Sequence, residues 1–297
     1  MAELPELTIL QKQMHEALAG KRITLAEITQ PKCLNVPVKK ATTILVGRSI
    51  ASVIRKGKWL CLNLDPEHYL LLNPGMGADL WHYRKGTQLP AKYQLRIELT
   101  NGSGFTCRFW WFGHVHLLSP QQRSKHRQTA HIGPSPMDVT SQQLIEVARR
   151  YPRSTVKSLI VDQEKLAGIG NAYAHDVMWK AGLHPQRQLA SLLDEEIIRY
   201  HGAIRYVMQR AIDKGGLEKD FHQQQGNLDN VHELFLIGYK EGKPCPQCQT
   251  SIKKIRTGGT ATFICPTCQL NQSAGKTGPA PRRRAMKPKK RGQQVHK

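Results

Sequence analysis

The spacing of apolar residues at the start of the chain predicts an amphipathic helix. Apolar side chains recur there every three or four positions, at Leu7, Leu10, Met14 and Leu18. Pro5 suits a first helical turn and Gly20 suits a stop, so we expect a helix over residues 5–19. Such a helix places Glu3 and Glu6 at its N-terminal end.

From about residue 22 to residue 118 the pattern changes to short β-rich runs separated by turn residues. The clearest runs cover residues 49–54, 59–64, 69–72, 93–99 and 105–112. Asn101 and Gly102 form a dipeptide that is typical of a hairpin. We therefore predict an all-β sandwich or barrel, which together with the first helix makes a domain over residues 1–120.

The second half of the chain has a helical pattern. Residues 121–138 are polar and basic and contain Gly and Pro, which predicts a linker. Helical spacing then returns in runs that cover residues 144–147, 156–166, 172–180 and 195–212. We expect a helical domain over residues 139–240, a cysteine module over 241–270 and a disordered basic tail over 271–297. The fold class is therefore α+β and multidomain.

The charge of the 297-residue chain points to a polyanionic partner. The sequence holds 44 Lys and Arg against 22 Asp and Glu, and thirteen of the basic residues but no acidic one follow Glu241. Nucleic acid fits this basic end better than an anionic membrane does. The acidic first residues differ from a secretory signal, and no run of 18 apolar residues occurs, so we expect a soluble, cytoplasmic protein.

Four of the cysteines form two close pairs with sixteen residues between them. The pairs are Cys245 with Cys248 and Cys265 with Cys268. Four thiolates with this spacing match one tetrahedral zinc ion, and the spacer fits a two-stranded hairpin. Because a closed four-thiolate site has no open position for substrate, the zinc is expected to be structural. Lys253, Lys254 and Arg256 on the hairpin suit a phosphate backbone, with a solvated basic face as the alternative.

A Gly-x-Gly turn lies between two of the predicted helices. Gly168 and Gly170 permit a tight turn whose backbone N–H groups, at the start of the next helix, suit a phosphate. Asn171 follows and suits a helix cap, which is the purely structural alternative.

Several short motifs follow one another along the chain in a fixed order. They are the opening Met-Ala-Glu-Leu-Pro-Glu-Leu, Arg55-Lys-Gly-Lys58, Gly75-Met76, Phe112-Gly113, Ile132-Gly-Pro-Ser-Pro136, Gly168-Ile-Gly-Asn-Ala-Tyr173, Ala181-Gly-Leu-His-Pro185, Gly215-Gly216 and the cysteine module. Their order resembles that of the formamidopyrimidine-DNA glycosylase/endonuclease VIII family over residues 1 to about 270. The resemblance implies an N-terminal β-sandwich, a helical domain with a helix–two-turn–helix and a C-terminal zinc-finger hairpin.

The resemblance also implies a reaction on double-stranded DNA that contains a damaged base or an abasic site. Family enzymes flip the base out, attack its sugar C1′ with the N-terminal amine and form a Schiff base that leads to strand cleavage. By position, the nucleophile is the amine of Ala2 after Met1 removal, and Glu3 is the acid and base at the deoxyribose. Glu6 is then a structural or assisting carboxylate, and Lys58 contacts a phosphate.

Further DNA contacts follow from the same resemblance. Asn171 holds a phosphate from the helical domain, and Met76 and Phe112 fill the space that the flipped nucleotide leaves. The base pocket lies in loops of the helical domain, here within residues 218–230, with a flexible polar loop as the alternative. A monomer is expected.

The chain departs from the family pattern at four places. Ala2 replaces the usual catalytic proline, and Asn73-Pro74 replaces the common His-Leu before Gly75. Trp110 replaces an arginine that fills the void, and Thr260 replaces an arginine that reaches phosphates. Trp110 and Trp111 can stack on the orphaned base instead, although burial of one tryptophan in the sandwich core is the alternative. The basic tail can restore general affinity for DNA.

Two functions follow from this pattern. The first is a DNA glycosylase of base excision repair, in which the loss of proline leaves the AP-lyase step open. The second is a catalytically impaired protein of the same fold that binds lesions or abasic sites.

Overall fold

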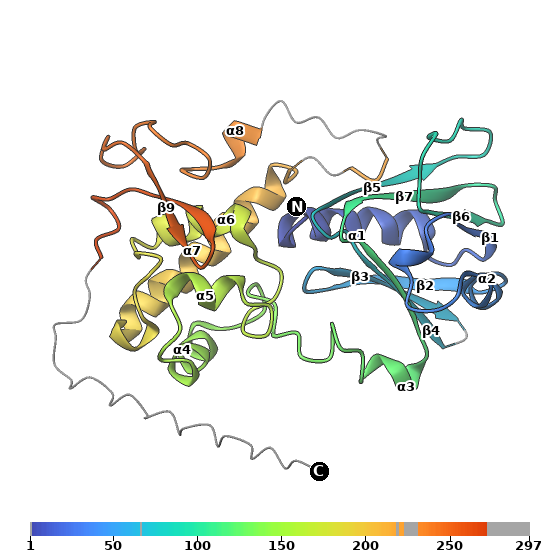
Figure 1. Ribbon diagram of the computed structural model, residues 1–297, viewed down its shortest axis with the longest axis horizontal. Helices are drawn as coiled ribbons and strands as arrows, with labels where there is room; N and C mark the ends of the chain where they lie inside the picture. The colour runs from blue at the N-terminus through green and yellow to red at the C-terminus, as the bar shows by residue number, and fades with distance from the viewer. Residues whose placement is uncertain (1, 66, 218–219, 223–230, 272–297) are drawn as a thin grey trace, which may run out of the picture.

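The computed structural model describes residues 2–65, 67–217, 220–222 and 231–271 (Figure 1). The strands of the N-terminal half lie on one side of the molecule, and the helices of the C-terminal half and the zinc-finger hairpin lie on the other. The chain starts between these halves. None of the described helices has the length and apolar character that crossing a bilayer requires.

The first helix, α1 (Leu4–Leu18), confirms the helix predicted over residues 5–19. Its apolar face is buried in the sandwich core through Leu7, Leu10, Met14 and Leu18. Leu4 belongs instead to the core of the helical half, so the first turn of α1 reaches across the boundary between the two halves.

The N-terminal half is a sandwich of antiparallel sheets, as the sequence predicts. One sheet has the order β1-β6-β7-β5 and the other β2-β3-β4-β8. The strands are β1 (Ile23–Ile28), β2 (Ser49–Lys56), β3 (Trp59–Asp65), β4 (His68–Asn73), β5 (Gly77–Tyr83), β6 (Leu95–Leu99), β7 (Gly104–Trp111) and β8 (His114–Leu118). Strands β1, β5 and β8 lie outside the predicted runs. A short helix, α2 (Val38–Leu45), and a 3₁₀ turn (Pro31–Cys33) interrupt the region that the pattern predicts to be β.

The segment predicted as a linker is tied to the sandwich. It begins with the short helix α3 (Pro120–Arg123), and the Lys56 ammonium donates a hydrogen bond to the backbone carbonyl of Thr129 at 2.9 Å. His126 hydrogen-bonds His116 of β8 at 2.8 Å. These contacts fix the path of the chain between its two halves.

The C-terminal half is helical, as predicted. Its elements are α4 (Ser141–Arg150), α5 (Val156–Val161), α6 (Asn171–Lys180), a 3₁₀ turn (Leu189–Ser191), α7 (Asp194–Asp213) and α8 (Val231–Leu234). The helix predicted over residues 156–166 is too long, because α5 ends at Val161. Asp162 leaves the helical conformation, and its carboxylate accepts a hydrogen bond from the Glu164 backbone at 3.1 Å, which closes a turn.

The zinc-finger hairpin consists of β9 (Lys253–Thr257) and β10 (Thr260–Ile264). Thr257 pairs with Thr260 at its tip, as the sixteen-residue spacer predicts. Phe263 and Ile252 form a small apolar core with Trp179 of α6, which anchors the hairpin on the helical half.

Candidate functional site

The Glu3 carboxylate lies at the centre of the contact between the two halves. It is fully buried, and it accepts hydrogen bonds from the backbone N–H groups of Gly170 at 2.7 Å and Ala172 at 3.0 Å. Burial raises the pKa of Glu3, while the Lys58 ammonium and these two hydrogen bonds oppose the shift. The site therefore holds a carboxyl group whose proton affinity is increased by burial, although a cation lies beside it.

The same hydrogen bonds correct the interpretation of the Gly-x-Gly turn. The N–H groups at the start of α6 do bind an anion, as predicted, but the anion is the Glu3 carboxylate of the same chain rather than a phosphate. Gly168 adopts a φ of +113°, and its carbonyl accepts a hydrogen bond from the Leu4 backbone at 2.9 Å. The turn therefore clamps the start of α1 to the helical half.

Glu6 completes this clamp. It is fully buried, and it accepts hydrogen bonds from the backbone N–H of Glu3 at 2.7 Å and from that of Leu217 at 2.9 Å. The Tyr173 hydroxyl donates a short hydrogen bond to the same carboxylate. Burial, followed by the charge of Glu6, raises the pKa of Tyr173. Sequence reasoning missed Tyr173 and Leu217 in this role, because neither residue carries a local signal for it.

Ala2 and Lys58 lie beside Glu3. Ala2 is 4% exposed and packs in the sandwich core, while Met1 lies outside the described residues. A Cβ atom built on Gly170 would lie 2.3 Å from Glu3 Oε1 and 2.3 Å from Lys58 Nζ. The absence of a side chain at Gly170 therefore makes room for both groups. Together these residues place an N-terminal segment, a carboxyl group and an ammonium in one confined space.

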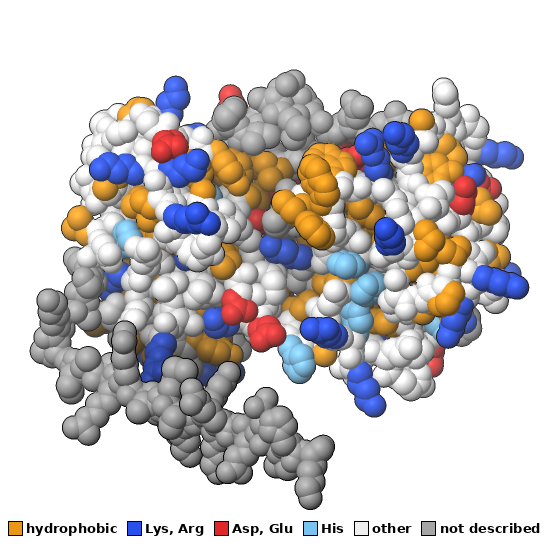
Figure 2. Space-filling view, viewed as in Figure 1, with side chains coloured by type: hydrophobic (Ala, Val, Ile, Leu, Met, Phe, Trp, Pro, Cys, Tyr) orange, Lys and Arg blue, Asp and Glu red, His pale blue; other side chains and the backbone are white. Residues whose placement is uncertain are grey.

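An apolar edge of exposed side chains lies where strand β5 begins and strand β7 ends. We use this name for Met76, Trp110, Trp111 and Phe112, which are 48%, 46%, 66% and 76% exposed. Figure 2 shows hydrophobic side chains gathered near the centre of one face, between the two halves. Large apolar side chains grouped in solvent mark a binding surface.

The exposure of the apolar edge rules out the alternative that one tryptophan fills the sandwich core. The Trp110 indole N–H instead donates a hydrogen bond to Asp79 at 2.9 Å, and the ring covers Gly77. Phe112 adopts a φ of +54°, which turns the chain sharply after β7. Met76 joins the edge because its backbone N–H donates to the Trp111 carbonyl at 3.0 Å.

The tip of the zinc-finger hairpin contacts the start of α6. The Asn171 amide donates to the Ala261 carbonyl at 3.1 Å, and the Thr260 hydroxyl donates to the Asn171 side-chain oxygen at 3.2 Å. The purely structural alternative for Asn171, a helix cap, is wrong, because Gly170 occupies the cap position and Asn171 is the first residue of α6. The hairpin cations predicted to face a phosphate backbone are exposed; they are Lys253, Lys254 and Arg256.

The four paired cysteines converge as their spacing predicts. Their sulfur atoms lie within 4.8 Å of one another, and the separation is 3.8 Å from Cys245 to Cys268 and 3.4 Å from Cys248 to Cys265. Tetrahedral zinc with Zn–S bonds of about 2.3 Å requires sulfur atoms about 3.8 Å apart. The residues fit one structural zinc ion, and all four positions of the metal are filled by thiolates.

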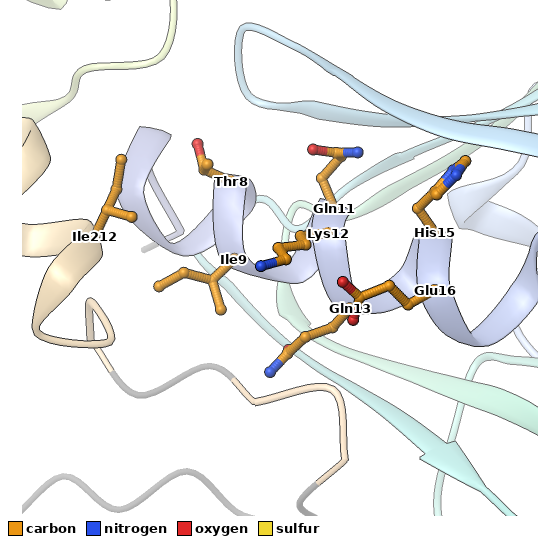
Figure 3. Close-up of a pocket in the computed structure, with 8 residues that line it drawn as sticks. All are labelled: Thr8, Ile9, Gln11, Lys12, Gln13, His15, Glu16 and Ile212. Carbon is orange, nitrogen blue, oxygen red and sulfur yellow. The ribbon is translucent and has the colours of Figure 1, made fainter.

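A separate groove of about 580 Å³ runs along the outer side of α1 (Figure 3). Its lining includes Thr8, Lys12 and His15 of α1, with Ile212 contributed by α7. None of these residues belongs to the cluster around Glu3. Most of the predicted base pocket (residues 218, 219 and 223–230) and the basic tail from residue 272 lie outside the described residues.

Comparisons with known proteins match most of the chain. The family models that match are the formamidopyrimidine-DNA glycosylase N-terminal domain over residues 1–110, the formamidopyrimidine-DNA glycosylase H2TH domain over 132–222 and the zinc finger found in FPG and IleRS over 242–271. The formamidopyrimidine-DNA glycosylase of Chloroflexus aurantiacus is 34% identical over 275 residues, which cover 91% of this chain and 98% of the relative. That of Gluconobacter oxydans is 32% identical and covers 91% of this chain and 100% of the relative.

Solved structures are similar over the same extent. A complex of Lactococcus lactis Fpg with DNA that contains an abasic site has a TM-score of 0.80 at 25% identity, and it covers 90% of this chain and 99% of that one. The G226P mutant of the same protein, in complex with a Fapy-dG containing DNA, has a TM-score of 0.81 at 24% identity with the same coverage, which reflects a shared fold.

Proposed function

Because the chain belongs to the formamidopyrimidine-DNA glycosylase family, we propose that it is a DNA glycosylase of base excision repair that removes a damaged base from duplex DNA. The observation that carries this function is the cluster of Ala2, Glu3 and Lys58 where the two halves meet. The Glu3 carboxylate also ties α1 to the helical half, so the raised pKa of this group beside the N-terminus and the Lys58 ammonium is what favours catalysis over lesion binding alone.

The amine of Ala2, once Met1 is removed, is the proposed nucleophile. Its nitrogen bonds to C1′ of the flipped nucleotide, while the glycosidic bond breaks and the departing base takes up a proton. The amine then loses a proton, and opening of the sugar ring gives the Schiff base from which strand cleavage proceeds. A primary α-amine with a pKa near 7.7–8.0 is about 10–20% neutral at pH 7, which is enough for this attack.

Glu3 is the proposed acid and base at the sugar. Its raised pKa brings the carboxyl group nearer to neutral pH, where one group can both donate and accept a proton. The backbone N–H groups of Gly170 and Ala172 hold the carboxyl group in place, so its position is set before the substrate arrives. Glu6 acts through Glu3, because it accepts the hydrogen bond of the Glu3 backbone N–H.

The DNA contacts are proposed from the surfaces around this cluster. Lys58 and Asn171 bind phosphates beside the lesion, and the exposed hairpin cations bind the backbone further away. The apolar edge enters the duplex where the base has left, since base–aromatic stacking is worth roughly 1–3 kcal/mol. The protein acts as a monomer in the cytoplasm.

The proposed reaction is tested by borohydride trapping on duplexes that contain an abasic site or an oxidised base. A covalent adduct at Ala2, located by peptide mass, is the expected result. Intact-mass measurement checks first that Met1 is absent. Glu3→Gln should remove base release while lesion binding persists. Lesion-selective binding with no adduct and no base release over a broad panel of lesions would support the catalytically impaired alternative instead.

A further inference from the structure

Lys157 of α5 carries a buried ammonium group directly under the tip of the zinc-finger hairpin. The residue is 5% exposed. Its Nζ donates hydrogen bonds to three threonine hydroxyls of the hairpin, at 3.1 Å to Thr257, 2.7 Å to Thr260 and 2.7 Å to Thr262. The Thr257 carbonyl lies at 3.3 Å and provides a further acceptor. Neutral oxygen atoms therefore surround the ammonium.

This ammonium has no anionic partner within the part of the chain that the structure describes. The carboxylates there that form ion pairs do so with other cations, such as Asp162 with Lys165. Burial lowers the pKa of Lys157 to about 8. A buried charge without a counter-charge is costly, so proteins rarely keep one that has no use.

The hydroxyl of Thr260 connects Lys157 to the surface. It accepts from the Lys157 ammonium and donates to the Asn171 side-chain oxygen, and Thr260 itself is exposed. The ammonium therefore lies one hydroxyl group away from the place where Asn171 is proposed to bind a phosphate. A positive charge behind this surface favours an anion in front of it.

We propose that Lys157 is a positioning residue for DNA, which supplies the positive charge for a backbone phosphate bound at Asn171 and Thr260. This inference rests on the proposed function. The hairpin has threonine at position 260, where the resemblance leads one to expect arginine. The Lys157 ammonium of α5 lies next to this threonine and provides the positive charge that the arginine would have had there. The phosphate, in turn, provides the counter-charge that the ammonium lacks in the free protein.

The first test is the salt dependence of DNA binding, measured with a duplex that contains a tetrahydrofuran abasic analogue. Each phosphate neutralised contributes about −0.9 to the slope of log K against log salt concentration. Lys157→Gln should reduce the magnitude of the slope by about one such unit and weaken binding roughly tenfold at low salt. Lys157→Arg should keep the slope, and Thr260→Arg in the Lys157→Gln background should restore it.

Lys165→Gln is the matched control, because Lys165 is a lysine of the same half that already pairs with Asp162 at 2.9 Å. It should leave the slope unchanged. If Lys157 only fixes the hairpin to α5, Lys157→Gln lowers the unfolding temperature but the slope stays as in the wild type, and the inference is overturned. Unfolding temperatures of all variants are measured alongside to separate the two effects.

The second test is proton uptake on binding, measured by titration calorimetry at pH 8.5 in buffers with different ionisation enthalpies. A phosphate near Lys157 raises its pKa, so the wild type should take up more protons than Lys157→Arg, which stays charged throughout. Any proton uptake by the Ala2 amine is the same in both proteins, so it cancels in the difference between their uptakes.

His175 of α6 also faces Lys157, but burial and then Lys157 lower its pKa to about 3, so it stays neutral at this pH. Tyr239, which packs on His175, has a raised pKa and also stays neutral.

The outcomes separate this inference from the proposed function. If the wild type does not prefer the tetrahydrofuran duplex over an undamaged one and forms no borohydride adduct, the proposed function fails. If it shows that preference but Lys157→Gln leaves both the slope and the proton uptake unchanged, the role of Lys157 alone is refuted.

Discussion

The substitution Gly170→Ala tests the catalytic geometry directly. The added methyl carbon would lie 2.3 Å from Glu3 Oε1 and 2.3 Å from Lys58 Nζ, whereas ordinary contacts begin near 3.4 Å. Both groups therefore have to move by about 1 Å to restore ordinary contacts. The backbone of Gly170 is extended, with a φ of −132°, so alanine itself is tolerated there without strain.

A displacement of about 1 Å at reacting groups costs on the order of 100-fold in rate. We therefore expect Gly170→Ala to slow single-turnover base release about 100-fold. The apolar edge and the zinc-finger hairpin are untouched, so the dissociation constant for a tetrahydrofuran duplex should change far less than the rate, even though the displaced Lys58 is a proposed phosphate contact. The assay is single-turnover excision on an oxidised-base duplex, with binding measured in parallel.

Gly202→Ala is the matched control. Gly202 lies within α7, and a Cβ atom built on it meets no other atom within 4 Å. Alanine should stabilise the helix by roughly 0.5–1 kcal/mol and leave excision unchanged. A Gly170→Ala protein that excises at the wild-type rate would refute the assignment of Glu3 as the acid and base of the reaction.

Other predictions concern the nucleophile, the apolar edge, the zinc site and acid stability. Ala2→Pro should raise the yield of the borohydride adduct, because a secondary amine forms an iminium directly, and an unchanged or lower yield would count against the N-terminal amine. Phe112→Ala should weaken binding to a tetrahydrofuran duplex by roughly 1–3 kcal/mol and leave binding to undamaged DNA nearly unchanged, as measured by fluorescence anisotropy. A strong chelator should release about one zinc ion per chain, measured with a chromophoric indicator. DNA binding should weaken as well, because without the metal the two cysteine pairs no longer hold the hairpin together. Burial, together with His126 and His114, lowers the pKa of His116 to about 4. As the pH falls from about 6.5 to 4, His116 binds a proton in the unfolded chain but not in the folded protein, so the free energy of unfolding decreases in that window. His116→Phe removes this effect and should move the acid-unfolding midpoint to lower pH.

Features with a local signal could be predicted from the sequence. The helix that begins near Pro5 follows from the spacing of its apolar residues, and the zinc site follows from two Cys-x2-Cys pairs. Strand β1 was missed because its buried positions do not alternate regularly with exposed ones. Helix α5 was predicted too long because the spacing of apolar residues carries no information about the turn that the Asp162 side chain forms at its end.

Features that depend on distant contacts could not be predicted. The sequence indicated an anion at the start of α6, but only the folded chain shows that the Glu3 carboxylate is that anion. Trp110 is exposed and donates a hydrogen bond to Asp79 of the neighbouring strand, a contact that the sequence pattern does not predict. Lys157 did carry a signal, since it is a lone cation in an apolar helical run, but its threonine partners come from about one hundred residues further along the chain.

The clamp at the start of α1 also has a consequence for how the protein is made. The residues at the N-terminus leave the ribosome first, yet the backbone groups that hold Glu3 come 167 and 169 residues later, and the one that holds Glu6 comes 211 residues later. Until those segments are synthesised, the proposed nucleophile and the Glu3 carboxyl group have no preformed site around them. A nascent or truncated chain therefore carries the N-terminal residues of the proposed active site without the later backbone groups that position them.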